Sequence, residues 1–138
     1  MNPRIPPIPI LLAALASGGP AWATGAAEIQ AALAQEARAA DPAFRGFSAQ
    51  RGESFYRNRH GGDWSCSTCH TDNPATAGSH AVTRKAIRPL APAADAERFT
   101  NPAKIEKWFR RNCNDVLNRA CTAQEKGDFI AYLLTAKR

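Results

Sequence analysis

The chain has 138 residues and a formal net charge of +6, with 44% hydrophobic and 22% charged residues. This length fits one small domain and excludes a large multidomain protein. The lysines and arginines are scattered rather than grouped in blocks, which argues against a nucleic acid as partner.

The first 23 residues have the features of an export signal. Arg4 and the amino terminus supply positive charge, residues 5–16 carry no charged or polar side chain, and Ala21-Trp22-Ala23 fits the small-x-small rule for cleavage. The apolar run is too short to span a bilayer. We therefore predict a cleaved signal peptide over residues 1–23 and a mature domain over residues 24–138 in the periplasm, where disulfides persist.

Two helices are predicted before the middle of the chain. The alanine-rich residues 26–40 predict a first helix or a partly ordered arm. Ser48 can cap a second helix that runs to about Tyr56, in which Gly52 would permit the close approach of another helix.

Residues 58–74 predict a loop, because they are rich in glycine, asparagine and aspartate, and they contain Cys66-Ser67-Thr68-Cys69-His70. This pentapeptide has the form of a c-type haem attachment site. Each thiol can add to one haem vinyl group, and the histidine that follows is carried beneath the iron as its proximal ligand. Zinc would require a second ligand pair and a thioredoxin-like site a βαβ pattern, and neither is present. We predict one covalent haem c on Cys66 and Cys69, with His70 coordinating the iron.

Residues 75–100 show no sustained periodicity and are predicted to wrap the haem as irregular chain. The carbonyl group of Pro89 or Pro74 can accept the Nδ1 proton of the proximal histidine, as such partners commonly do. Three basic residues here are either solvated charges or partners of the haem propionates, since guanidinium groups suit carboxylates: Arg84, Lys85 and Arg88.

Asn101-Pro102 predicts the start of a third helix that ends near Asn112. Thr122 and Glu125 form a capping box for a last helix that continues to about Ala136. The result is an all-α fold with no credible sheet, in the element order of the small class I cytochromes c. The third helix carries an apolar stripe of Ile105, Trp108 and Phe109, in which Trp108 either packs on the haem or is an ordinary core residue.

The sixth ligand of the iron decides between two functions, because two strong axial ligands favour electron transfer and a weak or absent one permits small molecules to bind. Met1 is the only methionine and is lost with the signal peptide, which excludes ligation by His and Met. His60, His80, an asparagine, a lysine or no residue remain. Asn112 is placed at the predicted helix end, where it could equally be a C-cap.

Four short runs closely resemble the sphaeroides haem protein family, whose members are oxygen-binding class I cytochromes c: Arg98-Phe99-Thr100, Ile105-Glu106-Lys107-Trp108-Phe109, Arg111-Asn112-Cys113 and Arg119-Ala120-Cys121. Residues 83–92 and 125–126 also match, and the likeness extends from about Gly52 to Leu133. Arg84 departs from it, because a glycine is expected there. The resemblance implies that Asn112 is the sixth ligand of ferric iron and leaves on reduction, and that Cys113 and Cys121 form a disulfide.

The expected function is that of an exported monohaem cytochrome that accepts electrons and binds O2, CO or NO at ferrous haem once Asn112 has left. A neutral amide is a weak ligand, and its hard oxygen prefers ferric iron. The resemblance implies a dihaem cytochrome c and a membrane cytochrome b as partners of a monomer. No acid/base pair indicates oxygen reduction or removal of NO or peroxide, so electron transfer is the safer expectation.

Two alternatives stay open. The first is a pure electron carrier whose haem is permanently six-coordinate through His80, His60 or a lysine. The second is a disulfide-stapled binding module without haem, in which the pentapeptide would be accidental.

Overall fold

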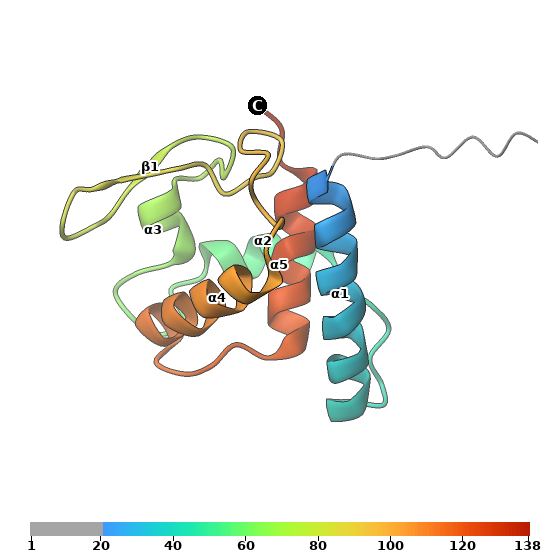
Figure 1. Cartoon of the computed structure of the whole chain (residues 1–138). Coiled ribbons are helices and arrows are strands. Elements are labelled where there is room, and N and C mark those ends of the chain that lie inside the picture. The colour runs from blue at the N-terminus through green and yellow to red at the C-terminus, as the bar shows by residue number, and fades with distance from the viewer. Residues whose placement is uncertain (1–20) are drawn as a thin grey trace, which may run out of the picture.

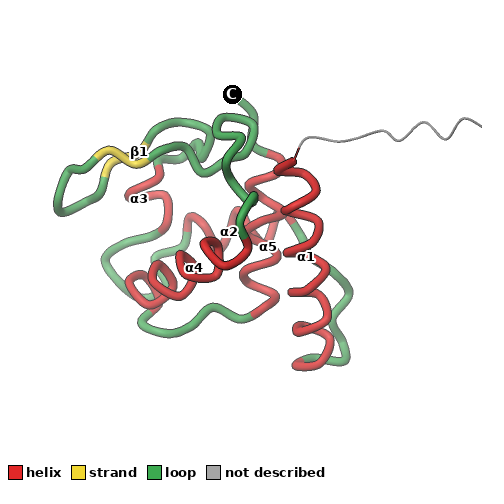
Figure 2. Tube along the Cα trace, viewed as in Figure 1, coloured by secondary structure: helices red, strands yellow, loops and turns green. Residues whose placement is uncertain are grey.

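The computed structural model describes residues 21–138 (Figures 1 and 2). The elements follow one another as α1 (Ala21–Ala40), α2 (Ala49–Arg57), α3 (Cys66–His70), β1 (Gly78–Ser79), β2 (Ala86–Ile87), α4 (Pro102–Leu117) and α5 (Ala123–Thr135). Residues 1–20 of the predicted signal peptide lie outside the described part, and residues 21–23 form the first turn of α1. None of the helices in residues 21–138 has both the length and the apolarity needed to cross a membrane.

The all-α prediction is confirmed with one addition. Two strands of two residues each form an antiparallel ribbon in which Gly78 pairs with Ile87 and Ser79 with Ala86. The ribbon lies within the stretch that was predicted to be irregular, and it projects from the helices beside α3 (Figures 1 and 2). A ribbon this short leaves almost no alternation of apolar and polar residues, which is why the sequence did not predict it.

The core lies where α2 crosses α5. Tyr56, Ile130 and Leu133 are the largest fully buried side chains. Gly52 is required at the crossing, as the sequence predicted, because a Cβ atom there would collide with the carbonyl oxygen of Asp128. Close approach of the two backbones therefore fixes how α2, and the haem motif that follows it, is placed on α5.

A buried carboxylate holds the same crossing together. The side chain of Asp128 is 4% exposed. Its Oδ1 accepts a hydrogen bond from the backbone N–H of Ser48 at 2.6 Å, and Arg51 donates to both carboxylate oxygens at 2.7 and 2.8 Å. Because Ser48 is the N-cap of α2, the negative charge also lies at the positive end of that helix dipole.

Helix α1 packs alongside α5, as the blue and red helices of Figure 1 show. Its buried face consists of Ala26, Leu33 and Ala37. The segment that was predicted as either a helix or a partly ordered arm is thus a helix, and it begins at Ala21 rather than at residue 26.

Helix α4 begins as predicted, with the Asn101 side chain accepting the N–H of Lys104 at 2.9 Å and Pro102 in the first turn. The predicted end near Asn112 is wrong. The helix continues to Leu117 and ends at Asn118, whose left-handed φ of 56° marks the C-cap. Asparagine adopts this conformation more readily than most residues, so Asn118 supplies the stop signal. The C-cap alternative for Asn112 is excluded by the same observation.

Candidate haem-binding site

The haem motif forms a single helical turn instead of the predicted loop. Ser65 caps α3 by accepting the N–H of Thr68 at 3.2 Å, and the hydroxyl of Thr68 accepts the N–H of Ser65 at 3.0 Å. This capping box stabilises a helix of five residues that would otherwise be too short to persist. The Ser-x-x-Thr pattern was a signal in the sequence that could have predicted the helix.

The helical turn places the two thiols of Cys66 and Cys69 one turn apart, on the same face. Both are free and half-buried, whereas the other two cysteines of the chain are bonded to each other. Burial raises the pKa of the Cys66 thiol to about 11, so it is protonated at neutral pH. Two free thiols and an imidazole on one short helix are the donor set that a covalent haem c requires, and the residues therefore fit this group.

His70 is in the protonation state that a ligand needs. Burial lowers the pKa of its imidazole to about 4, and the positive charge of Arg98 lowers it as well. The ring is therefore neutral at neutral pH, and a neutral imidazole nitrogen can coordinate iron.

Tyr56 fixes the end of the haem helix and was missed as a site residue. Its hydroxyl, on the fully buried side chain, donates to the carbonyl groups of His70 at 3.0 Å and Thr71 at 2.6 Å. Thr71 has a positive φ of 64°, so the chain turns sharply directly after His70. Tyr56 thus attaches that turn to the α2–α5 crossing, and only the tertiary structure reveals this.

Replacing Tyr56 by phenylalanine is expected to lower the free energy of unfolding by about 1–3 kcal/mol, because two carbonyl groups lose their shared donor. Guanidinium unfolding of the haem-loaded protein measures the loss. Tyr132→Phe is the control, since Tyr132 packs on the Tyr56 ring at 5.3 Å without a hydrogen bond to the haem helix. Equal losses in the two variants would contradict the assigned role.

Pro74 and Pro89, the two predicted carbonyl partners of His70, both accept hydrogen bonds from other groups. The carbonyl oxygen of Pro74 accepts the N–H groups of Leu90 at 2.8 Å and Ala91 at 2.9 Å. Both of its lone pairs are therefore occupied, which removes Pro74 as the predicted partner of His70. The carbonyl of Pro89 accepts one bond, from Arg98 Nε at 2.7 Å, and keeps a lone pair available.

The three predicted propionate partners differ in their surroundings. Arg88 differs from the other two, because its guanidinium group binds Asp95 at 2.6 Å and Glu97 at 2.7 Å. Arg84 and Lys85 are exposed in the turn of the ribbon. Arg84 has a φ of 59°, in the region that favours glycine, which explains why the resemblance leads one to expect a glycine there.

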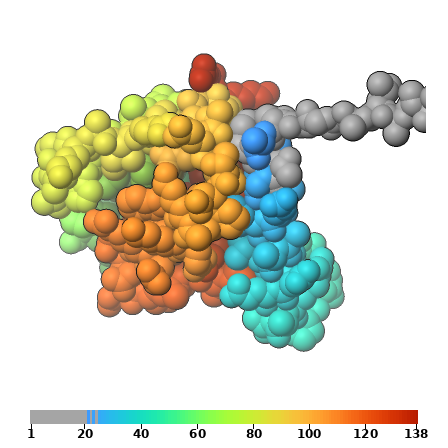
Figure 3. All heavy atoms as spheres, viewed as in Figure 1, coloured from blue at the N-terminus to red at the C-terminus, as the bar shows by residue number. Residues whose placement is uncertain are grey.

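The ribbon touches the haem helix directly. A Cβ atom on Gly78 would collide with the carbonyl oxygen of Cys69, and the N–H of Ala81 lies 3.4 Å from Cys69 Sγ. In Figure 3 the yellow-green ribbon and the orange α4 border the same side of the molecule. The segment that was predicted to wrap the haem thus lies against the helix that carries the two thiols.

The two histidines considered as sixth ligands are engaged in local turns. His60 Nε2 lies 2.9 Å from the carbonyl oxygen of Phe55, and the imidazole packs on the Phe55 ring with a centroid distance of 4.6 Å and a tilt of 56°. His80 Nδ1 accepts the N–H groups of Val82 and Thr83, each at 3.2 Å. Coordination of iron through His60 Nε2 would break its contact with the Phe55 carbonyl group. His80 uses only Nδ1 in its turn, so its Nε2 is available for coordination.

Asn112 lies in the interior of α4, with its side chain exposed. It follows Trp108 by one helical turn, so the two side chains share a face. Trp108 is 41% exposed, and the Arg111 guanidinium lies 5.7 Å from the centre of its ring. The structure therefore places Asn112 and Trp108 together on the flank of a regular helix.

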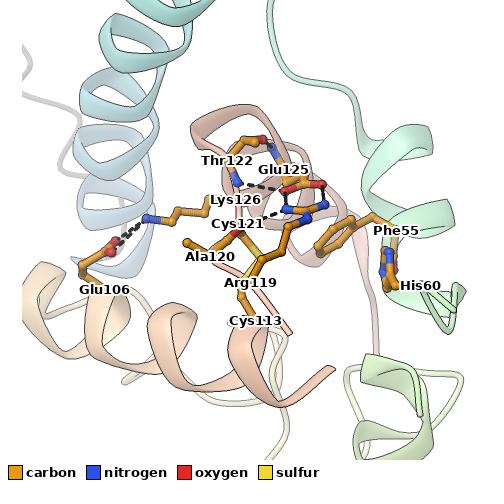
Figure 4. The surroundings of a disulfide bond; sticks show 10 residues. All are labelled: Phe55, His60, Glu106, Cys113, Arg119, Ala120, Cys121, Thr122, Glu125 and Lys126. Carbon is orange, nitrogen blue, oxygen red and sulfur yellow. Dashed lines mark hydrogen bonds and ion pairs between the residues drawn. A yellow bond between two sulfur atoms is a disulfide. The ribbon is translucent and has the colours of Figure 1, made fainter. Parts of the chain in front are cut away.

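Cys113, the residue after Asn112, anchors α4 to the segment directly before α5. Cys113 and Cys121 form a disulfide with a Cα–Cα distance of 5.6 Å. Figure 4 shows this bond, the paired Arg119 and Glu125 side chains, which approach to 2.6 Å, and the contact of Lys126 with Glu106 at 2.8 Å. Two of these contacts fasten α4, at Glu106 and at Cys113, so Asn112 lies next to a covalent anchor of its helix.

Comparison with known proteins gives a consistent set of relatives. Residues 42–133 match the family described as Domain of unknown function (DUF1924). The cytochrome c-type protein SHP of Cereibacter sphaeroides is 42% identical over 128 residues, which cover 90% of this chain and 94% of that protein. Cytochrome c'' of Methylophilus methylotrophus is 42% identical over 103 residues, 72% of either chain.

Solved structures of the same two proteins share the fold. The crystal structure of oxidised cytochrome c'' has a TM-score of 0.75 at 38% identity and covers 83% of this chain and 97% of its own. The structure of oxidised SHP, an oxygen-binding cytochrome c, has a TM-score of 0.68 at 38% identity, with 78% and 94% covered. A solution structure of cytochrome c'', with a TM-score of 0.74, concerns the structural basis of haem-ligand detachment.

Proposed function

The chain belongs to the DUF1924 family and is a relative of the c-type cytochromes SHP and cytochrome c'', and on this premise we propose a redox-opened gas-binding function for it. It would be an exported monohaem cytochrome that accepts an electron, releases Asn112 and then binds O2 or another diatomic gas. When bound, the haem supplies the iron for electron acceptance and gas binding.

One observation carries the proposal. A neutral amide, that of Asn112, lies exposed beside an exposed tryptophan on a rigid helix, and the chain has no methionine after Met1. The Asn112 amide is therefore a weak ligand for iron, as a side chain that is released on reduction has to be. His70, in contrast, is neutral, half-buried and fixed from behind by Tyr56, as a permanent ligand requires.

The residues would divide the work of holding the haem. Cys66 and Cys69 would hold the group covalently, and His70 would coordinate its iron from α3. Asn112 would supply the second, weaker ligand and, once displaced, its NH2 group would be able to donate a hydrogen bond to a bound diatomic gas.

The names of the relatives support this division. SHP is described as an oxygen-binding cytochrome c, and cytochrome c'' is studied for haem-ligand detachment. Both properties follow for this chain if Asn112 is the detachable ligand. Export to the periplasm and electron supply from a dihaem cytochrome c and a membrane cytochrome b complete the proposal.

Absorption spectra of the ferric protein, the dithionite-reduced protein and the reduced protein with CO test it. We expect a low-spin ferric spectrum, a high-spin ferrous spectrum, and a sharp shift of the Soret band with CO. A low-spin ferrous spectrum that CO leaves unchanged would contradict gas binding and indicate a six-coordinate electron carrier, with His80 as the first ligand to replace.

A further inference from the structure

The outward side of α4 carries a row of cations, which we call the basic face of α4. Four exposed side chains make it up: Lys104, Lys107, Arg110 and Arg111. On the opposite side of the helix, Ile105 and Phe109 pack against the core. In Figure 3 the orange atoms of α4 form part of the molecular surface that faces the viewer. The basic face is therefore open to a partner.

The cations of this face are left without partners inside the chain. In α2 and α5 every basic residue pairs with a carboxylate: Arg51, Arg57 and Lys126. Within residues 21–138, by contrast, Lys104, Lys107 and Arg110 make no ion pair, and Arg111 approaches Asp115 only to 3.9 Å. Glu106, the other carboxylate of α4, is bound by Lys126 at 2.8 Å. The positive charge of the face is thus not neutralised by the fold.

The same charges do not stabilise the helix that carries them. Lys104 is the third helical residue, because the Asn101 cap accepts its N–H, and a negative side chain is favoured at this end of the helix dipole. The corresponding position of α5 holds Glu125. Lys107 and Arg111 are four residues apart, a spacing at which like charges repel. The charge pattern is therefore unfavourable for α4 alone, and an external negative surface would relieve it.

The layout of the basic face fits an extended acidic protein surface. The four cations span about two helical turns, or about 10 Å, so they do not converge on one small anion. The apolar residues of α4 face the core, which leaves none to insert into a membrane as an interfacial helix does. At the margin of the face lies Trp108, which is 41% exposed and 5.7 Å from the Arg111 guanidinium group. Tryptophan and arginine are enriched where proteins bind proteins.

We propose that the basic face of α4 is the docking surface for an acidic redox protein that delivers the electron to the haem. The proposal rests on the haem attachment and electron acceptance of the proposed function, but not on gas binding. Transient redox complexes are small and are guided by complementary charge, as a row of unpaired cations allows. Asn112 follows Trp108 by one turn on the same helix, so the donor docks beside the ligand that reduction releases.

Stopped-flow reduction of the haem-loaded ferric protein by flavodoxin hydroquinone tests the proposal. Flavodoxin is a small acidic protein, and its hydroquinone gives one electron to the ferric haem and becomes the semiquinone. In K104E/K107E the second-order rate constant at low salt is expected to fall about tenfold. The difference should disappear near 1 M salt, where the Debye length is about 3 Å.

The variant is expected to fold, because both substitutions suit the helix. A glutamate at position 104 lies at the positive end of the dipole, and one at position 107 can pair with Arg111. Guanidinium unfolding should therefore show no loss of stability. K137E/R138E is the matched control, since it reverses two exposed cations beyond the end of α5. Its rate constant should stay within about twofold of the wild type.

A binding measurement separates docking from electron transfer. Oxidised flavodoxin cannot reduce the ferric protein, so titration with it reports association alone. The amide resonances that shift should be concentrated in α4, and K104E/K107E should abolish the shifts. Shifts confined to other elements would overturn the proposal.

Three further results would also overturn it. One is an unchanged rate constant in K104E/K107E, and another is an equal fall in K137E/R138E. The third is binding to phosphatidylglycerol vesicles that K104E/K107E abolishes without slowing flavodoxin, because the occupant would then be a membrane. A wild-type protein that ignores CO would overturn gas binding and leave these measurements valid, so the two failures are distinguishable.

Discussion

Replacing Asn112 by alanine is expected to convert the ferric protein from low-spin to high-spin, because the substitution removes the proposed sixth ligand. External ligands such as imidazole should then bind ferric protein about 10–100-fold more tightly, since the site no longer has to be vacated first. Absorption spectra and ligand titrations measure both changes. Alanine is the strongest helix former and Asn112 lies inside α4, so the helix is expected to persist.

Asn114→Ala is the matched control, two residues further along α4 and therefore on the other side of the helix. It should leave the spectrum and the affinity for imidazole unchanged. A low-spin ferric spectrum in Asn112→Ala, together with a high-spin spectrum in His80→Ala, would assign the sixth position to His80 and refute the proposed release.

Replacing Asp128 by alanine is expected to cost about 3 kcal/mol of unfolding free energy, the lower part of the range for breaking a buried ion pair. The loss is not larger because Arg51, whose side chain is 50% exposed, can turn toward water. The N–H of Ser48 loses its acceptor at the N-terminus of α2, so the helix end is weakened as well. Guanidinium unfolding monitored by circular dichroism gives the difference.

Two further variants make this result specific. Asp128→Asn keeps an acceptor for Ser48 but removes the charge, and an intermediate loss is expected. Asp115→Ala removes an exposed carboxylate that lies 3.9 Å from Arg111, where a surface pair contributes about 0–1 kcal/mol. If Asp115→Ala is as costly as Asp128→Ala, the buried carboxylate does not hold the α2–α5 crossing.

The helix starts were predictable because local chemistry determines them. Ser48, Asn101 and Thr122 each cap a helix with their own side chain, and each was identified from sequence. Gly52 was also predicted correctly as a point of close approach. In the three caps the signal lies within a few residues of the helix start that it produces. Gly52 differs, because its close contact is with Asp128 on α5, and the sequence predicted the close approach without identifying the partner.

Helix ends were harder to predict. Asn112, Asn114 and Asn118 are all asparagines near the end of α4, and each is a plausible C-cap by residue type. The structure selects Asn118, with the disulfide of Cys113 holding the preceding turn to α5. The extension of α4 past Asn112 is thus decided by contacts that no local pattern contains.

The site was predictable where it consists of consecutive residues and not where it is assembled from distant ones. The pentapeptide at residues 66–70 indicates haem attachment by its residue types and their spacing alone. Tyr56 reaches the haem helix from elsewhere in the chain, and a tyrosine in an apolar stripe carries no mark of this role. Arg88 was named as a propionate partner, and residue type alone did not reveal that its guanidinium group binds Asp95 and Glu97.

The anchoring of α4 sets how far Asn112 can travel. Under the proposed function, the released amide would remain tethered within reach of the position that it left, because Cys113 is bonded to Cys121 and five more helical residues follow Asn112. Its effective concentration there would be fixed by the tether and would not change when the protein is diluted. A gas molecule would then compete with this internal ligand, whose strength would depend on the oxidation state of the iron. Under the proposed function, gas uptake would therefore follow the supply of electrons more closely than the abundance of the gas.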